Sequence, residues 1–355
     1  MKMTILGTFK ANLTYLTINL FLISCAQNQQ NKSADFTQVN VNSITIAFYN
    51  CENLFDINHE QGKEDRDFTP DGKYHYTQKI YEQKLHNIAT VLQSMDNKKH
   101  QAPAIAGLAE IENDGVLKDL CNQPELAPMH YQHICHFGPD PRGINVGFIY
   151  NPSLFKLLKE ETIPVVFSNG AHSRDILHIY GILDGDTVHV FINHWTSRRG
   201  DEEKSEIKRI AAARINKEAM DAITSTDKHA RIIVMGDFND NPNDQSILST
   251  LDANHNIKEV EDTELFNPFA EIYKSGNGTE KYNNSWNLFD QIIITGSFLN
   301  SANGHLQYNS AEIYNPEFIT ETSKKHAPIP HRSFAGSRWI NGYSDHFPVL
   351  ITLTK

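Results

Sequence analysis

Six polar segments of this sequence border apolar, β-rich runs, and they do not all stand at the same end of their runs. Asn50, Glu110, Asn193 and Asp237 directly follow such runs, whereas Asp290 and Asp345 precede theirs. A purely parallel sheet gathers its functional residues at the carboxyl ends of its strands. If these side chains meet at one edge, some neighbouring strands must run in opposite directions. The sequence therefore predicts mixed or antiparallel sheets with helices outside, and not a doubly wound parallel fold.

The chain from residue 41 to residue 355 is expected to form one α/β domain, because no repeat or low-complexity linker interrupts it. Apolar residues recur at helical spacing in residues 77–95 and 202–223, which predicts two long helices. Together with short β-rich runs, the pattern indicates roughly ten strands and at least three helices. The predicted strands are residues 44–49, 105–108, 146–150, 165–167, 176–182, 188–192, 232–235, 291–295 and 347–353.

The first 40 residues have the pattern of an export signal followed by a tether. Lys2 and Lys10 are not balanced by an acid, and a short apolar stretch then ends in Leu-Ile-Ser-Cys. This ending resembles a bacterial lipoprotein signal, in which Cys25 becomes the lipidated first residue. We expect a signal peptide over residues 1–24 and a flexible tether over residues 25–40. The alternative is an ordinary secretory signal or an uncleaved anchor.

Charge and hydropathy argue against two classes of protein. Lys and Arg total 32 against 43 Asp and Glu, and a formal net charge of -11 argues against a broad basic surface for nucleic acid. The mean hydropathy of -0.46 argues against a multi-pass membrane protein. Four cysteines are too few for a disulfide scaffold. After lipidation of Cys25, either a Cys121–Cys135 bridge or three free thiols would remain.

The run Gly-Asp-Phe-Asn-Asp at residues 236–240 ends an apolar strand. It places Asp237 and Asn239 on the same side of an extended chain, where a carboxylate beside a carboxamide can activate water. An EF-hand calcium loop is excluded, because Pro242 and Leu248 stand where that loop needs Gly and Glu. An Asx turn that caps the strand is the remaining alternative.

Two further motifs carry histidines. His346 follows Asp345 at the start of a β-rich run, and a nearby carboxylate can set the tautomer of an imidazole there. His194 follows another run and precedes two arginines, the first of which is Arg198. Guanidinium groups suit phosphate oxygens. Alternatively, these arginines only pair with the acids at residues 201–203.

Glu110 and Asn50 each end an apolar run. A carboxylate in the position of Glu110 is costly to bury unless it binds a cation or caps a helix. Trp195, next to His194, either stacks on a base or packs beneath a helix. The segment 324–339, which is rich in basic residues and proline, is either a substrate-facing rim or a solvated insertion. Each feature alone is weak support for a function.

Taken together and in this order, the motifs resemble the endonuclease/exonuclease/phosphatase superfamily of DNase I-like metal-dependent phosphoesterases. The resemblance runs from about residue 44 to residue 353, and GDFND and SDHFPV are its most specific parts. YNCENLFD, GLAEIEN, PRGINVGFIYNP and NHWTSRRG are similar to an exported bacterial lipoprotein branch. The resemblance implies a four-layer α/β sandwich, in which two mixed or antiparallel sheets pack face to face with helices outside. Serine-hydrolase (G-x-S-x-G) and P-loop (G-x-x-x-x-G-K) signatures are absent.

The resemblance also implies a role for each residue of the site. Glu110 matches the main Mg²⁺ carboxylate, with Asn50 and Asp345 close to the ion, and Mn²⁺ is an alternative metal. The expected catalytic residues are Asp237 and Asn239, which orient and deprotonate the attacking water; His346, which stabilises the transition state and is oriented by Asp290 or Asp345; and His194. The expected phosphate-binding residues are Asn50, His194, Arg142 and Arg198.

The function that follows is hydrolysis of a phosphodiester by metal-assisted in-line attack of water on phosphorus. We expect first an endonuclease acting on extracellular or periplasmic DNA or RNA. The alternatives are a phosphatase, a phospholipid-type phosphodiesterase, or a catalytically silent binding lipoprotein on the same fold. We expect the protein to be attached to a bacterial outer membrane or cell surface by its lipid anchor alone. The alternative is a secreted protein. No obligate protein partner is indicated.

Overall fold

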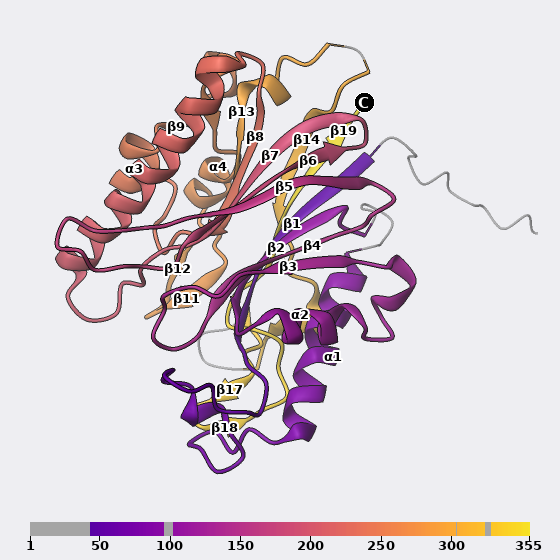
Figure 1. Ribbon diagram of the computed structural model, residues 1–355, viewed down its shortest axis with the longest axis vertical. Helices are drawn as coiled ribbons and strands as arrows, with labels where there is room; N and C mark the ends of the chain where they lie inside the picture. The colour runs from indigo at the N-terminus through magenta and orange to yellow at the C-terminus, as the bar shows by residue number, and fades with distance from the viewer. Residues whose placement is uncertain (1–42, 96–101, 303, 324–327) are drawn as a thin grey trace, which may run out of the picture. The chain divides into compact units, whose positions relative to one another are not determined.

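A computed structural model describes residues 43–95, 102–302, 304–323 and 328–355 of the chain, which fall in one compact unit, Val39–Lys355 (Figure 1). The predicted signal peptide, the tether and Cys25 lie outside the described residues and stay predictions. Within the described part of the chain, no helix combines the length and apolarity needed to cross a bilayer.

Six strands form the first large sheet. Its order is β14 (Gln307–Ile313), β19 (Val349–Thr354), β1 (Ser43–Leu54), β2 (Ile105–Ile111), β4 (Asn145–Tyr150) and β3 (Gln132–Cys135). β1 runs parallel to β2 but antiparallel to β19, and β2 runs antiparallel to β4. The strand directions are mixed, as the positions of the polar segments predicted.

Seven strands form the second large sheet, which is also mixed. β7 and β8 are parallel, whereas β8 and β13 are antiparallel. The order is β5 (Phe155–Ile163), β6 (Ile176–Leu183), β7 (Asp186–His194), β8 (Arg231–Asp237), β13 (Asp290–Thr295), β10 (Leu265–Phe266) and β9 (Ala253–Asn254). Three small hairpins complete the β structure: β11 (Glu280–Tyr282) with β12 (Ser285–Asn287), β15 (Thr320–Glu321) with β16 (Ile329–Pro330), and β17 (Phe334–Ala335) with β18 (Arg338–Trp339).

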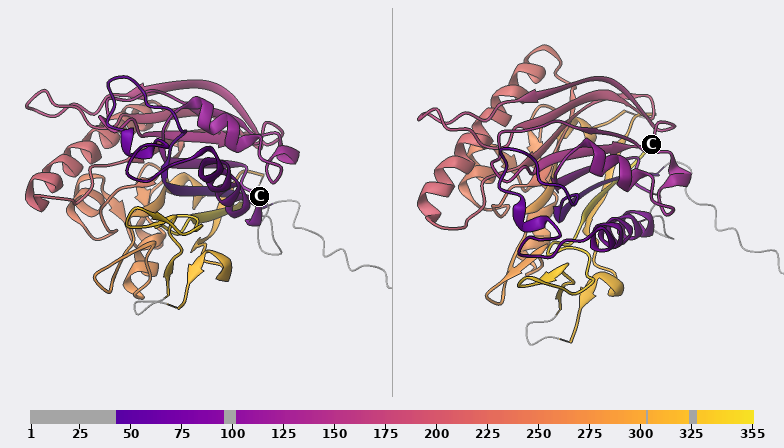
Figure 2. Two further views of the ribbon diagram at one scale, coloured as in Figure 1. Left: turned by 90° about the horizontal axis from the view of Figure 1, so that it is seen from below. Right: turned by 60° about the horizontal axis from the view of Figure 1, so that its bottom comes forward.

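The two large sheets pack face to face and helices cover their outer faces (Figures 1 and 2). In β1, Ile46 and Phe48 point into the core between the sheets, whereas Ala47 and Tyr49 point outward. The outward residues pack with α1 (Gln78–Ser94) and α2 (Asp114–Cys121). On the other sheet, outward residues of β8 pack with α3 (Glu202–Thr226), and the short α4 (Phe269–Lys274) lies near β13 and β14. The four-layer sandwich is therefore confirmed.

Most predicted elements are present at the predicted places. The helices over residues 77–95 and 202–223 are α1 and α3, and eight of the nine predicted strands are found. The exception is residues 165–167, where Val166 makes only an isolated bridge to His172. Cys51, Cys121 and Cys135 are free thiols, so the open alternative of a Cys121–Cys135 bridge is not realised.

Candidate active site

The pairing of β7, β8 and β13 brings three predicted site residues side by side. His194 is the register partner of Asp237 across the parallel pair β7–β8. Asp290 is the partner of Asp237 across the antiparallel pair β8–β13. Asp290 therefore begins its strand at the same edge at which the other two strands end. This reversal explains why the sequence places it before an apolar run.

The facing sheet brings the other predicted residues to the same edge. Asn50 lies in β1 and Glu110 in the parallel strand β2, and the strand that follows His346 runs antiparallel to β1. The registers of β1 and β2 both shift at this point, and Glu110 has a φ of 61°. Such bulges re-aim side chains beside functional sites.

Two side-chain hydrogen bonds cross from one sheet to the other. Asn50 Nδ2 donates to Asp237 Oδ2 at 3.0 Å, and His346 Nδ1 lies 2.7 Å from Asp290 Oδ2. All four residues are buried. Because buried polar groups need partners, these bonds hold the two sheet edges in one fixed relation.

The pKa of Asp237 is shifted toward neutral pH. Burial, and then the negative charge of Asp290, raise the pKa of Asp237 to about 6. The backbone N–H of Asn239 donates to Asp237 Oδ1 at 2.9 Å, and the left-handed backbone of Asn239, with a φ of 51°, permits this turn. Asn239 Nδ2 in turn donates to the carbonyl of Trp195 at 3.2 Å. A carboxylate with this pKa can accept a proton from water.

The pKa values of His346 and His194 are shifted in opposite directions. Burial alone would lower the pKa of His346, but Asp290 outweighs it and holds that pKa well above its usual value. His346 is therefore a cation with a second N–H to donate. Burial, and then Arg174, hold the pKa of His194 well below its usual value, so this imidazole is neutral. Its Nε2 lies 3.6 Å from Asp237 Oδ2.

Asp290 and Asp345, the two candidate partners of His346, lie in different places. Asp290 contacts the imidazole, whereas Asp345 Oδ2 accepts a hydrogen bond from Arg332 Nη2 at 2.9 Å. The arrangement thus favours Asp290 as the residue that orients His346. Asp345 still lies close enough to Glu110 that its negative charge, after burial, helps raise the pKa of that carboxyl group.

The donors at this edge fit a hard divalent cation, which prefers oxygen ligands. Ligand atoms of Asp237, Asp290 and His346 all lie within 4.8 Å of one another. The protonated imidazole is a poor ligand, but Asp290 Oδ1 is buried and has no hydrogen-bond partner among the described residues. Glu110 uses Oε2 to accept the N–H of Asn53 at 2.8 Å, while its Oε1 lies 3.9 Å from His194 Nε2.

The two arginines predicted to bind phosphate differ in their surroundings. The Arg142 side chain is 40% exposed, and its Nε lies 3.4 Å from Asp140. Its charge is close enough to lower the pKa values of Glu110 and His194. Arg198 instead donates to the carbonyl of Asn239 at 2.8 Å and pairs with two carboxylates.

The two carboxylates that pair with Arg198 belong to Asp240 and Asp244, and Arg198 Nη2 lies 2.7 Å from Asp240 Oδ1. These pairs compete with a phosphate for the guanidinium of Arg198, but Asp240 is shared with Arg209, whose Nε lies 2.8 Å from Asp240 Oδ1, so phosphate binding by Arg198 stays a prediction. Arg198 is placed to hold the loop after β8 in position. Arg198 Nε also lies 3.6 Å from Glu202 Oε1, so the alternative of pairing with the acids at residues 201–203 is realised for Glu202.

The sequence pattern missed several residues that support the site. Ser344 Oγ donates to the carbonyl of Asn50 at 2.6 Å and accepts the N–H of His346 at 3.1 Å. Arg174 is buried and donates to the carbonyl of His194 at 2.7 Å and to Asp140 Oδ2 at 2.6 Å. Ser344 could have been noticed within SDHFPV, but Arg174 carries no local signal.

Two open questions from the sequence are answered by packing. Trp195 is buried and makes an edge contact with Phe238 at 4.7 Å, so it packs and does not face a base. In the segment 324–339, residues 324–327 lie outside the described residues, and Arg332 reaches Asp345. This contact brings at least one residue of that segment to the site.

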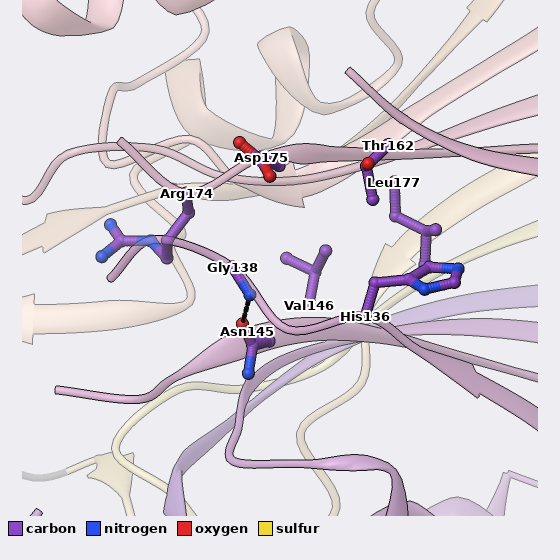
Figure 3. Close-up of a pocket in the computed structure, with 8 residues that line it drawn as sticks. All are labelled: His136, Gly138, Asn145, Val146, Thr162, Arg174, Asp175 and Leu177. Atoms are coloured by element: carbon purple, nitrogen blue, oxygen red, sulfur yellow. Dashed lines mark hydrogen bonds between the residues drawn. The ribbon is translucent and has the colours of Figure 1, made fainter. Parts of the chain in front are cut away.

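A small cavity lies beside the buried Arg174 (Figure 3). Its lining includes Asn145, whose Oδ1 accepts the N–H of Gly138 at 2.7 Å. The cavity volume is about 10 Å³. That is room for about one water molecule, so this cavity is not a substrate site.

The chemistry of the site is clear from its parts. A carboxylate poised to accept a proton, a cationic imidazole, a neutral imidazole and cation-binding oxygens converge at one edge of the sandwich. Such a set can bind an anionic centre and direct water at it.

Comparisons with known proteins agree with this chemistry. The sequence model of the Endonuclease/Exonuclease/phosphatase family matches residues 45–355. None of the curated proteins compared with the sequence matches it.

Solved structures show the same fold at low identity. An endonuclease/exonuclease/phosphatase family protein from Bacteroides thetaiotaomicron aligns with a TM-score of 0.55 and 18% identity, over 88% of this chain and 97% of that one. A mannosyl-6-phosphatase from the same organism has a TM-score of 0.54 and 19% identity, over 88% and 100%. TDP2 from D. rerio, complexed with a single strand DNA product, has a TM-score of 0.53 and 14% identity, over 88% and 99%. The family match spans most of the sequence, and the chain therefore belongs to the endonuclease/exonuclease/phosphatase family.

Proposed function

We propose that this protein is a divalent-metal-dependent phosphodiester hydrolase that acts as an endonuclease on nucleic acid. The observation that carries the proposal is the pair of hydrogen bonds between the sheets, Asn50–Asp237 and His346–Asp290. They set a proton-accepting carboxylate next to a cationic imidazole, as hydrolysis of a phosphoester requires.

Each residue then has a defined task. Asp237 accepts the proton of the attacking water, and Asn239 orients that water. His346 donates hydrogen bonds to the phosphoryl oxygens as negative charge builds on them, while Asp290 keeps the imidazole protonated. His194, Asn50 and Arg142 contribute further contacts to the phosphate group.

The metal assignment rests on the oxygen donors at this edge. Glu110 is the main ligand in this proposal, with Asn50 and Asp345 close to the ion, and Mg²⁺ or Mn²⁺ is the metal. When bound, the ion supplies positive charge that stabilises the phosphoryl group during attack.

A nucleic acid substrate is supported by the likeness to TDP2, whose structure holds a single strand DNA product. A second candidate is a phosphatase acting on a small phosphoester. The net charge of -11 and the pairing of Arg198 with two carboxylates favour a compact substrate over a long polyanion. The likeness to a mannosyl-6-phosphatase supports the same alternative. A silent binding protein is disfavoured because the predicted catalytic residues are all present and two pairs of site residues, Asn50–Asp237 and His346–Asp290, are hydrogen-bonded.

The location proposed for the enzyme is outside the cytoplasm. The export signal in residues 1–24 and lipidation of Cys25 would attach it to an outer membrane or cell surface, with the tether as the only link. This arrangement gives access to extracellular or periplasmic phosphodiesters.

The test is plasmid cleavage by the secreted part of the chain, residues 26–355, with Mg²⁺, with EDTA and with the His346→Ala variant. Nicking that needs Mg²⁺ and is lost in the variant is the expected result. If the folded wild type does not nick DNA or cleave RNA but hydrolyses sugar phosphates, the phosphatase alternative replaces the nuclease. Hydrolysis of neither class by the folded protein would overturn the enzymatic proposal.

A further inference from the structure

The hairpin β11–β12 is attached directly to the residues that carry the chemistry. Thr279, the buried residue before it, accepts with its carbonyl the N–H of Phe347 at 2.9 Å. The hydroxyl of Thr279 accepts the N–H of Asp290 at 3.4 Å. Phe347 follows His346 in the chain. The base of the hairpin is therefore fixed to Asp290 and to the residue that follows His346.

The two faces of the hairpin have different environments. On one face Lys281 pairs with Trp286, the Lys281 ammonium lies 5.0 Å from the indole centroid, and the indole lies 6.0 Å from the ring of Phe347. This face is anchored to the protein. Because side chains alternate along a strand, Glu280 and Tyr282 share the opposite face.

Glu280 shows which way that opposite face looks. Its side chain accepts a hydrogen bond from Asn287 Nδ2 at 3.3 Å. Burial raises the pKa of Glu280, and Glu280 directly follows Thr279, which is hydrogen-bonded to Asp290 and Phe347, so this face begins beside the His346–Asp290 pair. Tyr282 lies on the same face, two residues farther from the base of the hairpin.

Tyr282 is exposed to solvent beside a tight turn. Its relative exposure is 65%. The two turn residues, Asn283 and Asn284, have φ values of 47° and 70°, which is the backbone of a tight type I′ hairpin turn. At about 3.3 Å per strand residue, Tyr282 stands about 10 Å from Thr279. This separation suits contact with a nucleotide next to the one under attack.

We propose that Tyr282 is a stacking platform for an unpaired nucleobase that flanks the scissile phosphate. The inference rests on the proposed function and adds to it a preference for nucleic acid with unpaired bases over a fully paired duplex. Arg332 is paired with Asp345 and the chain is acidic overall, with a formal net charge of -11, so a broad basic surface that would hold a duplex is not expected. A stacked base adds affinity that does not depend on a basic surface. In a duplex the base faces are already covered by their neighbours.

The test compares single-stranded oligonucleotides that differ only at the base. One substrate carries ordinary bases, and the other carries abasic sites on both sides of the central phosphate. Cleavage and binding by fluorescence anisotropy are measured with divalent metal for wild type, Tyr282→Ala and Tyr282→Phe. Ile207→Ala, which removes a side chain of similar exposure, 63%, from α3, is the matched control.

We expect Tyr282→Ala to lower kcat/KM for the base-bearing strand by about 5- to 150-fold, mainly through KM. The abasic strand should change less than about twofold, and Tyr282→Phe should behave as the wild type because it keeps the ring. Equal losses on both strands, or no loss on either, would overturn the inference. If the wild type cleaves neither strand, plasmid cleavage decides whether the proposed function fails, and the anisotropy comparison decides separately whether Tyr282 stacks on a base.

Discussion

His346 is the single residue on which the proposed chemistry depends most. Its imidazole is held as a cation by Asp290 at 2.7 Å, so it acts as a preorganised donor. We expect His346→Ala to reduce kcat by about 100- to 1,000-fold, the usual cost of removing one such donor. Circular dichroism should show an unchanged fold. His133→Ala, at a histidine on the edge strand β3, is the control and should keep full activity. A His346→Ala variant with more than a tenth of wild-type activity would contradict the role.

Glu110 is the residue whose change should report on the metal. Its carboxylate lies in a bulged part of β2, and Oε2 already accepts the N–H of Asn53. Glu110→Gln keeps the size and that hydrogen bond but removes the charge that a divalent cation needs. We expect the Mg²⁺ concentration for half-maximal activity to rise by at least about tenfold. EDTA should abolish the activity of the wild type, and added Mg²⁺ should restore that activity. An unchanged Mg²⁺ titration would place the ion at other residues.

At the scale of the element, the pair β7–β8 determines how closely His194 approaches Asp237. Gly236 lies opposite Asn193, and a Cβ added to Gly236 would come within 2.5 Å of the carbonyl oxygen of Asn193. Backbone cannot move aside as a side chain can, so Gly236→Ala must separate the strands. We expect a loss of about 1–3 kcal/mol in the free energy of unfolding, measured with urea, and a lower kcat.

The control for that prediction is another crowded glycine. A Cβ at Gly107 would meet the flexible end of Met235 at 2.6 Å, inside the core between the sheets. Because the Met235 side chain can change rotamer, Gly107→Ala should lower the free energy of unfolding less than Gly236→Ala does. Equal costs would mean that side-chain packing, and not the spacing of β7 and β8, decides stability here.

A second element-scale prediction concerns acid stability on the outer face of β6 and β7. His178 lies between Glu161 and His189, at 2.9 and 3.0 Å. Burial, and then the neighbouring His178, lower the pKa of His189 to about 4. A histidine whose pKa is lower in the folded state than in the unfolded state destabilises the fold as the pH falls from the unfolded-state pKa toward the folded-state pKa. The affected window therefore runs from about pH 6.5 down to about pH 4.

Between pH 7.5 and pH 5, we expect the free energy of unfolding, measured with urea, to fall by about 1 kcal/mol more for the wild type than for His189→Gln. The difference is no larger because the partial exposure of His189 screens the effect. His172→Gln, at an exposed histidine, should follow the wild type. Identical pH slopes for wild type and His189→Gln would show that His189 titrates normally in the folded protein.

These elements also show what sequence can and cannot predict. Strands such as β8 were predictable because they are apolar and end in polar residues. The charged edge strand β5 was missed, since Phe155–Ile163 alternates too weakly to be told from a loop. Residues 165–167 look like a strand but lack a partner strand. The motif residues were predictable, whereas their cross-sheet pairing, and the link from Arg174 to Asp140, depend on registers between distant segments.

At the scale of the whole molecule, the site exists only where the two sheets meet. Asn50 and His346 belong to one sheet edge, and Asp237 and Asp290 to the other. Any change that shifts the sheets against each other therefore alters both catalytic pairs at once. The helical layers lie on the outer faces of the sheets, so the residues of the site come from the sheets and the loops at their edge (Figure 2).

The location of the molecule gives the last prediction. If Cys25 is lipidated, the full chain expressed in a bacterium should sediment with membranes and enter the detergent phase, because each buried methylene of a lipid chain contributes about 0.8 kcal/mol. The Cys25→Ser variant should lose lipid labelling and leave the detergent phase. Cys135→Ser, at a half-buried free thiol, is the matched control and should fractionate as the wild type. Equal partition of Cys25→Ser and wild type would mean that the N-terminal segment is a cleaved secretory signal or an uncleaved anchor, and mass spectrometry of the mature N-terminus separates these two.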